Sequence, residues 1–289
     1  MCTLPGRFPY ADSLGSEVKR STANSYMKGL YMLLEHKIAV IAGDAYGVGY
    51  ATALLFMREG ARVVLIDDQA EPARETSQQA TSQQVQFIHA DVTNSDQVRS
   101  AVQACEQRFA KVHILFNVAG RHPIRQSFRD TTEETWGSML NRNLTSVFLC
   151  SKYFLPLMKR AGAGAIINHA SIDAVLGNPS IAGYSAAKGG VLPLTHVMAH
   201  DLAEFNIRVN SISTGGIRNS NTPPSHVDDA RIAVTPAGRM GTAQDVAKVA
   251  LFLASDLASY VNGANIVVDG GRTATTHGCY LDGRQPDKD

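Results

Sequence analysis

Tyr184 and Lys188, four positions apart, are the residues of this sequence best suited to acid–base chemistry. On a helix, positions i and i+4 project from one face, so both side chains would reach one site. A phenol is a poor base at its ordinary pKa of about 10, and a neighbouring ammonium favours the phenolate and lowers that pKa. The pair is therefore suited to moving a proton to or from a bound group. Taken alone, the same spacing also fits a surface pair without catalytic meaning.

A glycine-rich turn near residue 45 predicts a phosphate site. The apolar run 38–42 leads into this turn, and a helical pattern follows it. Glycines there let backbone N–H groups and the positive end of the helix approach a pyrophosphate, although ordinary strand-to-helix turns also use glycine. The expected cofactor contacts are Gly43, Tyr46, Gly47, Val48 and Gly49.

An acidic residue, Asp67, follows the next apolar run and lies 18 positions after Gly49. A carboxylate at that place accepts hydrogen bonds from the ribose hydroxyls of a dinucleotide and repels a 2′-phosphate. Asp68 adds negative charge, and the glycine turn contains no Lys or Arg. The sequence therefore predicts NAD rather than NADP, with a solvated strand-end Asp as the alternative.

Short apolar runs alternate with longer segments of helical periodicity, which predicts an α/β fold. We expect one doubly wound domain, a seven-stranded parallel sheet with helices on both faces. Strands are expected at 38–42, 62–66, 85–89, 114–118, 165–169, 208–212 and 265–268, and helices at 49–59, 97–109, 147–160, 184–204 and 243–253. Residues 213–238 are rich in Gly, Pro, Ser and Thr, so we expect a long loop there that acts as a substrate lid.

Composition excludes several classes of protein. The chain has 289 residues, 44% of them hydrophobic, and a net charge of +1, so neither a nucleic acid nor an anionic membrane is an expected partner. Its apolar runs are too short for a membrane span, and its N-terminus does not resemble a signal peptide. The four cysteines and nine histidines are scattered, which favours a cytoplasmic protein without a metal site.

The motifs, taken in order, resemble those of the short-chain dehydrogenase/reductase family, from about Leu34 to Gly271. The similarity rests on the glycine turn, Asp91-Val92, Asn117-Val118-Ala119-Gly120, Asn143, Ser171, the Tyr184-to-Lys188 motif and the segment 252–271. The resemblance implies a Rossmann-like catalytic domain over 34–271. Residues 1–33 would be a poorly ordered or subunit-packing extension, or an artefact of the start site, and 272–289 a C-terminal tail.

The resemblance also implies roles for individual residues. Ser171 would bond the substrate oxygen, Lys188 the nicotinamide ribose, and Asn143 a water that relays protons from Lys188. Further cofactor contacts would be Asp91, Val92, Asn117, Ala119, Gly120, Tyr184, Gly215 and Ile217. The substrate pocket would comprise Arg121, His122, Arg125, Asp173, Val175, Asn178, Ile181 and Gly216 to Ser220. The basic members of that set suggest a polar or anionic substrate, unless they simply face solvent.

Three positions depart from the family pattern. Ala42 replaces a Thr before the first glycine, Val118 replaces an Asn, and Thr214 stands where a Pro usually precedes Gly215. All three positions affect the scaffold or the positioning of the cofactor, and none of them is a predicted catalytic residue.

The expected function is reversible NAD-dependent hydride transfer between a secondary alcohol and its ketone. An NADPH-dependent ketone reductase of the 3-oxoacyl type and a catalytically silent dinucleotide-binding scaffold are the alternatives. The long helices from about Thr145 and Tyr184 resemble those that pair between subunits in the family, which implies a homotetramer, with a dimer as the alternative.

Overall fold

Seven apolar segments form one parallel sheet in the computed structural model, which describes residues 32–69, 84–118, 120, 123–218 and 226–275. The chain divides into two units, residues 1–32 and residues 33–289, and the second unit holds the sheet. Its strands are β1 (Ile38–Ala42), β2 (Arg62–Asp67), β3 (Val85–His89), β4 (Ile114–Asn117), β5 (Gly164–Ser171), β6 (Ile207–Thr214) and β9 (Asn265–Val268). They lie in the order β3-β2-β1-β4-β5-β6-β9, all parallel. The predicted fold class is confirmed.

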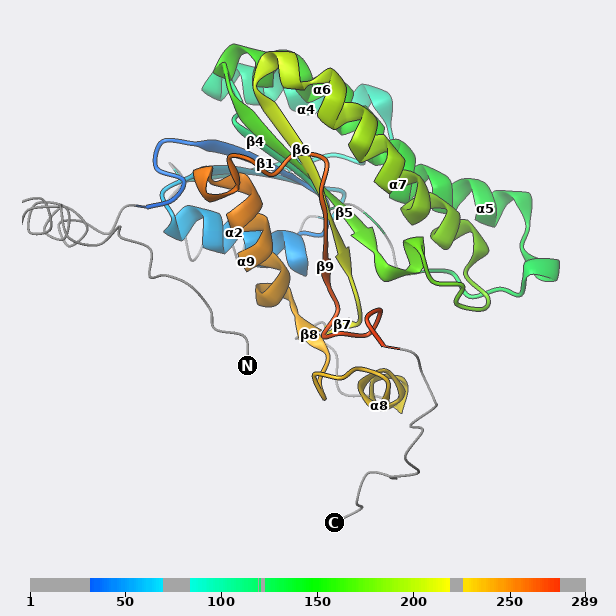
Figure 1. Ribbon diagram of the computed structural model, residues 1–289. Coiled ribbons are helices and arrows are strands. Elements are labelled where there is room, and N and C mark those ends of the chain that lie inside the picture. The colour runs from blue at the N-terminus through cyan, green and yellow to red at the C-terminus, as the bar shows by residue number, and fades with distance from the viewer. Residues whose placement is uncertain (1–31, 70–83, 119, 121–122, 219–225, 276–289) are drawn as a thin grey trace, which may run out of the picture. The chain divides into compact units, whose positions relative to one another are not determined.

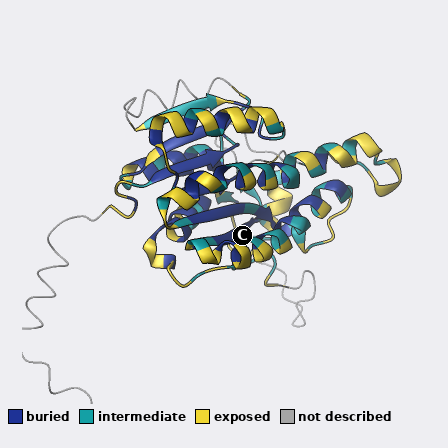
Figure 2. Cartoon of the chain, turned by 90° about the horizontal axis from the view of Figure 1, so that it is seen from above, coloured by how far each residue is buried: buried dark blue, intermediate teal, exposed yellow. Residues whose placement is uncertain are grey.

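Helices cover both faces of the sheet, as Figure 1 shows. One face carries α4 (Ser95–Phe109), α6 (Ser146–Ala161) and α7 (Ala182–Asp201), and the other carries α2 (Val48–Arg58) and α9 (Ala243–Ala254). Alternation along β1 explains the two layers. Val40 belongs to the core under α4 and α6, whereas Ala39 and Ile41 belong to the core under α2 and α9. Strands buried on both faces read as continuous apolar runs, and Figure 2 shows them buried between exposed helix surfaces.

The helix starts follow local capping. The side chain of Asn94 accepts hydrogen bonds from the backbone N–H groups of Asp96 and Gln97, so α4 begins two residues before the predicted start. Thr242 and Asp245 form a reciprocal capping box at the start of α9.

The prediction of a long loop over 213–238 is wrong in part. Strand β6 continues to Thr214, β7 (Ile217–Arg218) pairs with β8 (Gly241–Thr242), and α8 (His226–Ala233) lies between them. Residues 219–225 lie outside the described part of the chain. The helix escaped prediction because it is short, mostly exposed and preceded by prolines, so it has little apolar periodicity.

A second helix, α5 (Glu133–Leu140), was also absent from the prediction. Met139 is its one buried residue, and its exposed residues include Trp136 besides acidic ones. It runs through the π-helical turn η2 (Asn141–Thr145) directly into α6. The predicted helix 184–204 instead ends at Asp201, since a 3₁₀ turn, η4 (Ala203–Phe205), follows.

The carboxyl ends of the central strands meet at one edge of the sheet. Ala42 pairs with Asn117 at the ends of β1 and β4, and Ser171 pairs with Thr214 at the ends of β5 and β6. The strand order reverses between β1 and β4, which is where open α/β sheets bind ligands. The fold therefore places the glycine turn and Ser171 at the same edge.

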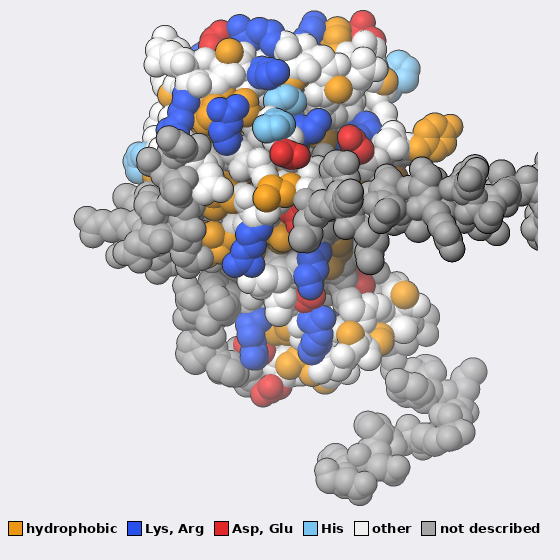
Figure 3. All heavy atoms as spheres, turned by 90° about the vertical axis from the view of Figure 1, so that its left-hand side faces the viewer, with side chains coloured by type: hydrophobic (Ala, Val, Ile, Leu, Met, Phe, Trp, Pro, Cys, Tyr) orange, Lys and Arg blue, Asp and Glu red, His pale blue; other side chains and the backbone are white. Residues whose placement is uncertain are grey.

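The molecular surface agrees with the small net charge. On the face in Figure 3, Lys and Arg side chains are interspersed with hydrophobic and acidic ones. No helix in the described ranges is long and apolar enough to span a membrane.

Candidate active site

The first turns of α7 bring the predicted pair to the end of β5. Lys188 is buried, and its Nζ donates to the backbone carbonyl of His169 at 2.8 Å. The same Nζ lies 6.0 Å from the centre of the Tyr184 ring, and the phenol hydrogen-bonds the Ser171 side chain. Three of the four predicted catalytic residues are thus in one cluster.

The electrostatics of Tyr184 differ from the expectation. Burial raises its pKa to about 12, Asp173 adds to that rise, and the bond with Ser171 opposes it. The predicted lowering by Lys188 is not among the influences on this pKa. Burial also lowers the pKa of Lys188 to about 8, against the opposing charge of Asp44. The phenol is therefore protonated in this state at neutral pH.

Asn143, the fourth predicted catalytic residue, lies fully buried in η2 beside the cluster. Its Nδ2 donates to the carbonyl of Met139 at 3.1 Å, while its buried Oδ1 has no hydrogen-bond partner. A Cβ on Gly120 would lie 2.7 Å from this Oδ1 and 3.2 Å from Lys188 Nζ. Gly120 thus keeps open a small polar space between the two side chains. An orphaned buried acceptor in such a space suits a bound water.

The glycine turn has the predicted backbone. Gly43 has φ 95°, a left-handed conformation that glycine adopts without strain, and α2 begins at Val48. A carboxylate already lies at the helix start, because Asp44 Oδ2 accepts from the N–H groups of Val48 at 2.6 Å and Gly49 at 3.3 Å. The sequence predicted that these N–H groups bind a pyrophosphate. It did not predict that the Asp44 carboxylate accepts from them, because that contact depends on the conformation of the Asp44 side chain.

Asp67 lies buried at the end of β2, next to the glycine turn. Its two carboxylate oxygens accept from the backbone N–H groups of Ala45 at 3.1 Å and Gln69 at 2.9 Å. Burial raises its pKa, and these two bonds oppose the rise. The acid is therefore positioned by the turn itself, at the place that the sequence predicted.

The other predicted cofactor residues are divided between the sheet edge and the scaffold. Asp91 Oδ1 accepts from the N–H and hydroxyl of Thr93, and Val92 is buried. The Asn117 amide donates to Ser151 and Asn168, both at 2.9 Å, so it ties β4 to α6 and β5. Gly215 and Gly216 connect β6 to β7, which begins at Ile217. Ala119 lies outside the described residues.

The predicted pocket residues gather only in part. Asp173 and Asn178 are bonded to each other beside Ser171. Ile181 is buried, whereas Val175 and Arg125 are exposed. Arg121, His122 and residues 219–220 lie outside the described ranges, so the expected basic edge is not defined by the structure.

Comparison with known proteins shows which protein family this chain belongs to. The sequence profile of the family described as Enoyl-(Acyl carrier protein) reductase matches residues 42–273. A 3-oxoacyl-[acyl-carrier-protein] reductase from Thermotoga maritima is 36% identical over 246 residues, which cover 83% of this chain and 99% of that protein. The chain belongs to the short-chain dehydrogenase/reductase family.

Two further similarities agree with this family. A cyclohexanol dehydrogenase from an Acinetobacter species is 35% identical over 243 residues, covering 83% of this chain and 96% of that protein. The solved short-chain type dehydrogenase/reductase from Mycobacterium marinum superposes with a TM-score of 0.79 at 30% identity, covering 85% of this chain and 98% of that chain. Like other short-chain dehydrogenases, this protein is an oxidoreductase of a family that uses nicotinamide dinucleotides.

The residues present fit such a cofactor. Gly120 leaves space beside Lys188, the unpartnered Asn143 Oδ1 faces it, and the glycine turn opens at the start of α2. At the Val48 N–H, a phosphate oxygen would compete with the Asp44 carboxylate.

His169 is a site residue that sequence reasoning missed. Its Nε2 lies 3.1 Å from Thr214 Oγ1, and the imidazole also hydrogen-bonds the backbone of Val118. Val118 and Thr214 are two of the positions where this chain departs from the short-chain dehydrogenase pattern. The signal was present in the sequence, because His169 lies two residues before Ser171 and shares its side of the strand.

Proposed function

We propose that this short-chain dehydrogenase catalyses reversible, NAD-dependent hydride transfer between a secondary alcohol and the corresponding ketone. The observation that supports this most strongly is the Ser171–Tyr184 hydrogen bond with the buried Lys188 amine beside it. These groups can hold the substrate oxygen and move its proton at one place.

Each catalytic side chain has a task in this reaction. Ser171 donates to the substrate oxygen and stabilises the charge that develops there. Tyr184 is protonated in this state, so it can donate its proton to the oxygen during reduction. It takes the O–H proton during oxidation only as the phenolate, which the positive charges of Lys188 and of a bound oxidised nicotinamide would favour. The free Oδ1 of Asn143 would hold a water that connects Lys188 to solvent. A nicotinamide held by the glycine turn and Lys188 would supply the hydride chemistry at the carbinol carbon, so one hydride and one proton would leave the alcohol as the ketone forms.

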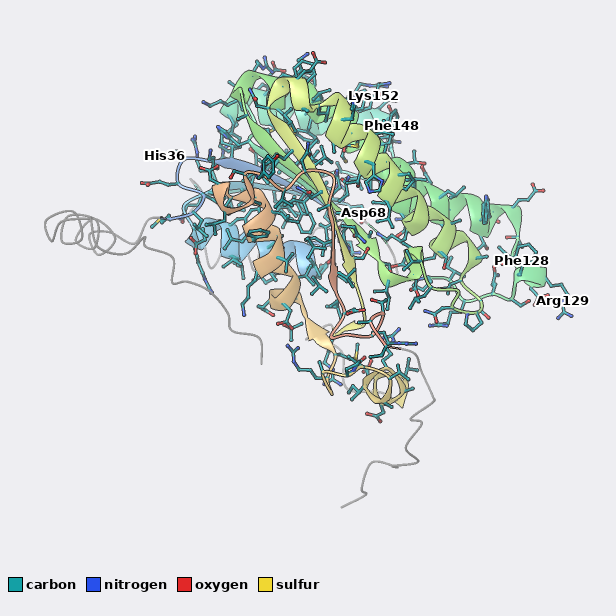
Figure 4. The ribbon with its side chains drawn as sticks, viewed as in Figure 1. His36, Asp68, Phe128, Arg129, Phe148 and Lys152 are labelled. Atoms are coloured by element: carbon teal, nitrogen blue, oxygen red, sulfur yellow. The ribbon has the colours of Figure 1, made fainter. Side chains whose placement is uncertain are left out.

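The preference for NAD rests on the acids around the glycine turn. Asp67 is fixed by two backbone N–H groups, and Asp68 follows it at the end of β2, where Figure 4 labels it. Two neighbouring carboxylates repel a 2′-phosphate and accept ribose hydroxyls.

Replacement of the phenol tests the catalytic proposal. Tyr184→Phe should lower kcat by a factor of at least about 100, because general acid–base catalysis is worth 10² to 10⁴. NAD affinity, measured by calorimetry, should change less than about threefold. Tyr260→Phe is the control, since that ring is fully exposed. Retention of a tenth of the wild-type turnover in Tyr184→Phe would refute the assigned role.

An NADPH-dependent reductase of the 3-oxoacyl type is the second candidate, because the T. maritima relative is named for that activity. Initial rates with NADH and NADPH on one ketone separate the two proposals. A silent dinucleotide-binding scaffold would bind cofactor and turn over neither ketone nor alcohol.

We further propose a homotetramer built through α6 and α7, with 34–271 as the catalytic domain, 1–33 as an extension and 272–289 as a tail. Phe148 on α6 and Val197 on α7 are 47% and 57% exposed, as subunit contacts would require.

We also propose a cytoplasmic location. Cys105 and Cys150 are free thiols, which agrees with it. The proposed partner is a small-molecule alcohol or ketone, with no metal, nucleic acid or membrane.

A further inference from the structure

A carboxylate lies directly beside the proposed catalytic oxygens. Asp173 is in the 3₁₀ turn η3 (Ile172–Ala174), two residues after Ser171. The Ser171 hydroxyl is 3.4 Å from Asp173 Oδ2, and Ser171 Oγ accepts from the Asp173 backbone N–H at 3.1 Å. Asp173 also raises the pKa of Tyr184 through its charge. The acid is therefore close enough to affect both groups that would contact the substrate oxygen.

The Asp173 side chain is held in place. Its Oδ1 accepts from the amide of Asn178, and its backbone is fixed by the bond to Ser171 Oγ. An ionised carboxylate has about four acceptor sites, so capacity remains after these contacts. Asp173 is partly buried, and a ligand hydrogen bond to a partly desolvated charge is stronger than one in water.

The position of this acid restricts what can bind next to the reacting carbon. A substrate carboxylate there would meet the like charge of Asp173, whereas a hydroxyl would donate to it. Ser171 Oγ and Asp173 Oδ2 are 3.4 Å apart, a separation that two oxygens on neighbouring carbons can bridge. One hydroxyl would contact Ser171 and Tyr184, and the other would contact Asp173.

We infer that Asp173 binds a second hydroxyl of the substrate, so that the site selects vicinal diols and polyols, with their hydroxyketones, over simple alcohols and 2-hydroxy acids. This inference rests on the proposed alcohol–ketone activity. Of the polar and anionic substrates suggested by the sequence, it favours the polar one, since among the described pocket residues Arg125 is exposed and the acid Asp173 lies beside Ser171.

The test compares three probes: cyclohexanol, trans-1,2-cyclohexanediol and 2-hydroxybutyrate. The ratio of kcat/KM for the diol to that for cyclohexanol, with NAD, should be at least about 10 in the wild type, because a hydrogen bond to a charged group is worth a factor of about 10 to 100. Asp173→Ala should bring that ratio to about 1. Asp173→Asn should keep part of it, since the amide oxygen still accepts, and should raise activity on 2-hydroxybutyrate. Asp201→Asn, an exposed acid at the end of α7, should match the wild type.

Binding of the same probes to the NAD complex, measured by saturation-transfer NMR, does not depend on turnover. Tighter binding of the diol that is lost in Asp173→Ala supports the inference even if turnover is slow. Equal kcat/KM for cyclohexanol and the diol overturns it while leaving the proposed activity intact. Absence of turnover with every alcohol and ketone defeats the proposed activity, and absence of diol binding as well defeats the inference.

Discussion

At the scale of single residues, the chemistry of this short-chain dehydrogenase depends on how each charged side chain is held. Tyr184 and Lys188 could be placed from their spacing of four residues, whereas Ser171 and Asn143 could be placed only through the family resemblance. The carboxylate of Asp44 could not be placed from sequence. Its contact with the Val48 N–H depends on the side-chain conformation and on the backbone φ of 53° at Asp44. Few residues besides Gly, Asn and Asp adopt that conformation readily.

Asp44 should make both stability and cofactor binding depend on pH. Burial raises its pKa to about 6 from 3.8, so the folded protein holds the proton more tightly than the unfolded chain. The free energy of unfolding should therefore fall as pH rises from about 4 to about 6. Asp44→Asn removes the ionised form while keeping an acceptor for the Val48 N–H. We expect it to stabilise the protein at pH 8 by about 3 kcal/mol, measured by urea unfolding.

The same substitution should also tighten NAD binding several-fold at pH 8, because a neutral amide does not repel the pyrophosphate. Both effects should shrink at pH 5, where Asp44 is largely protonated in the wild type. Glu204→Gln, which changes an exposed acid in η4, is the control. Equal stability of Asp44→Asn and wild type at pH 8 would contradict the assigned burial cost.

At the scale of elements, the sheet could be predicted because its inner strands are buried and read as apolar runs. The edge strands β3 and β9 are less buried. The helices α5 and α8 could not be predicted, since α5 has one buried residue and α8 is mostly exposed. The position of α5 is decided by its packing against α7. The unpredicted helix α8 lies within 213–238, the segment predicted to be a substrate lid. The predicted lid therefore contains a helix as well as loop residues.

The carboxyl ends of β5 and β6 are joined by His169. Burial and the charge of Lys188 lower the pKa of His169 to about 3, so its imidazole is neutral and bonds the hydroxyl of Thr214 at 3.1 Å. The backbone carbonyl of the same residue holds Lys188. Loss of the Thr214 hydroxyl should therefore disturb the end of β5 at His169 and, through the His169 carbonyl, the position of Lys188.

Thr214→Val keeps the shape of the side chain and removes the hydroxyl. We expect a loss of about 1 to 2 kcal/mol in the free energy of unfolding, because a partly buried ring nitrogen loses its partner. The KM for NAD should rise with it, since β6 leads directly to Gly215 and Ile217. Thr214→Ser retains the hydroxyl and should restore both values. A Thr214→Val variant as stable as the wild type, in chemical unfolding, would show that the His169 link contributes nothing.

At the scale of the whole molecule, the outer faces of α6 and α7 remain exposed in the single chain. Phe148 is 47% exposed, with the Lys152 ammonium 5.4 Å from its ring centre, and Figure 4 shows both on the outer side of α6. Phe128, which is 84% exposed, lies with Arg129 at the opposite end of the same layer. Sequence predicted the pairing of these helices only by resemblance, because an exposed aromatic residue does not reveal what covers it.

If α6 and α7 pair between subunits, Phe148→Lys should dissociate the assembly. A second positive charge beside Lys152 would have to be buried against a partner, and an unpaired buried charge costs several kcal/mol. Light scattering after size exclusion should give four times the chain mass of 31.1 kDa for the wild type and a smaller assembly for the variant. Phe128→Lys changes an equally large exposed ring away from these helices and should keep the wild-type mass. A Phe148→Lys variant that also keeps it would place the subunit contacts elsewhere on the molecule.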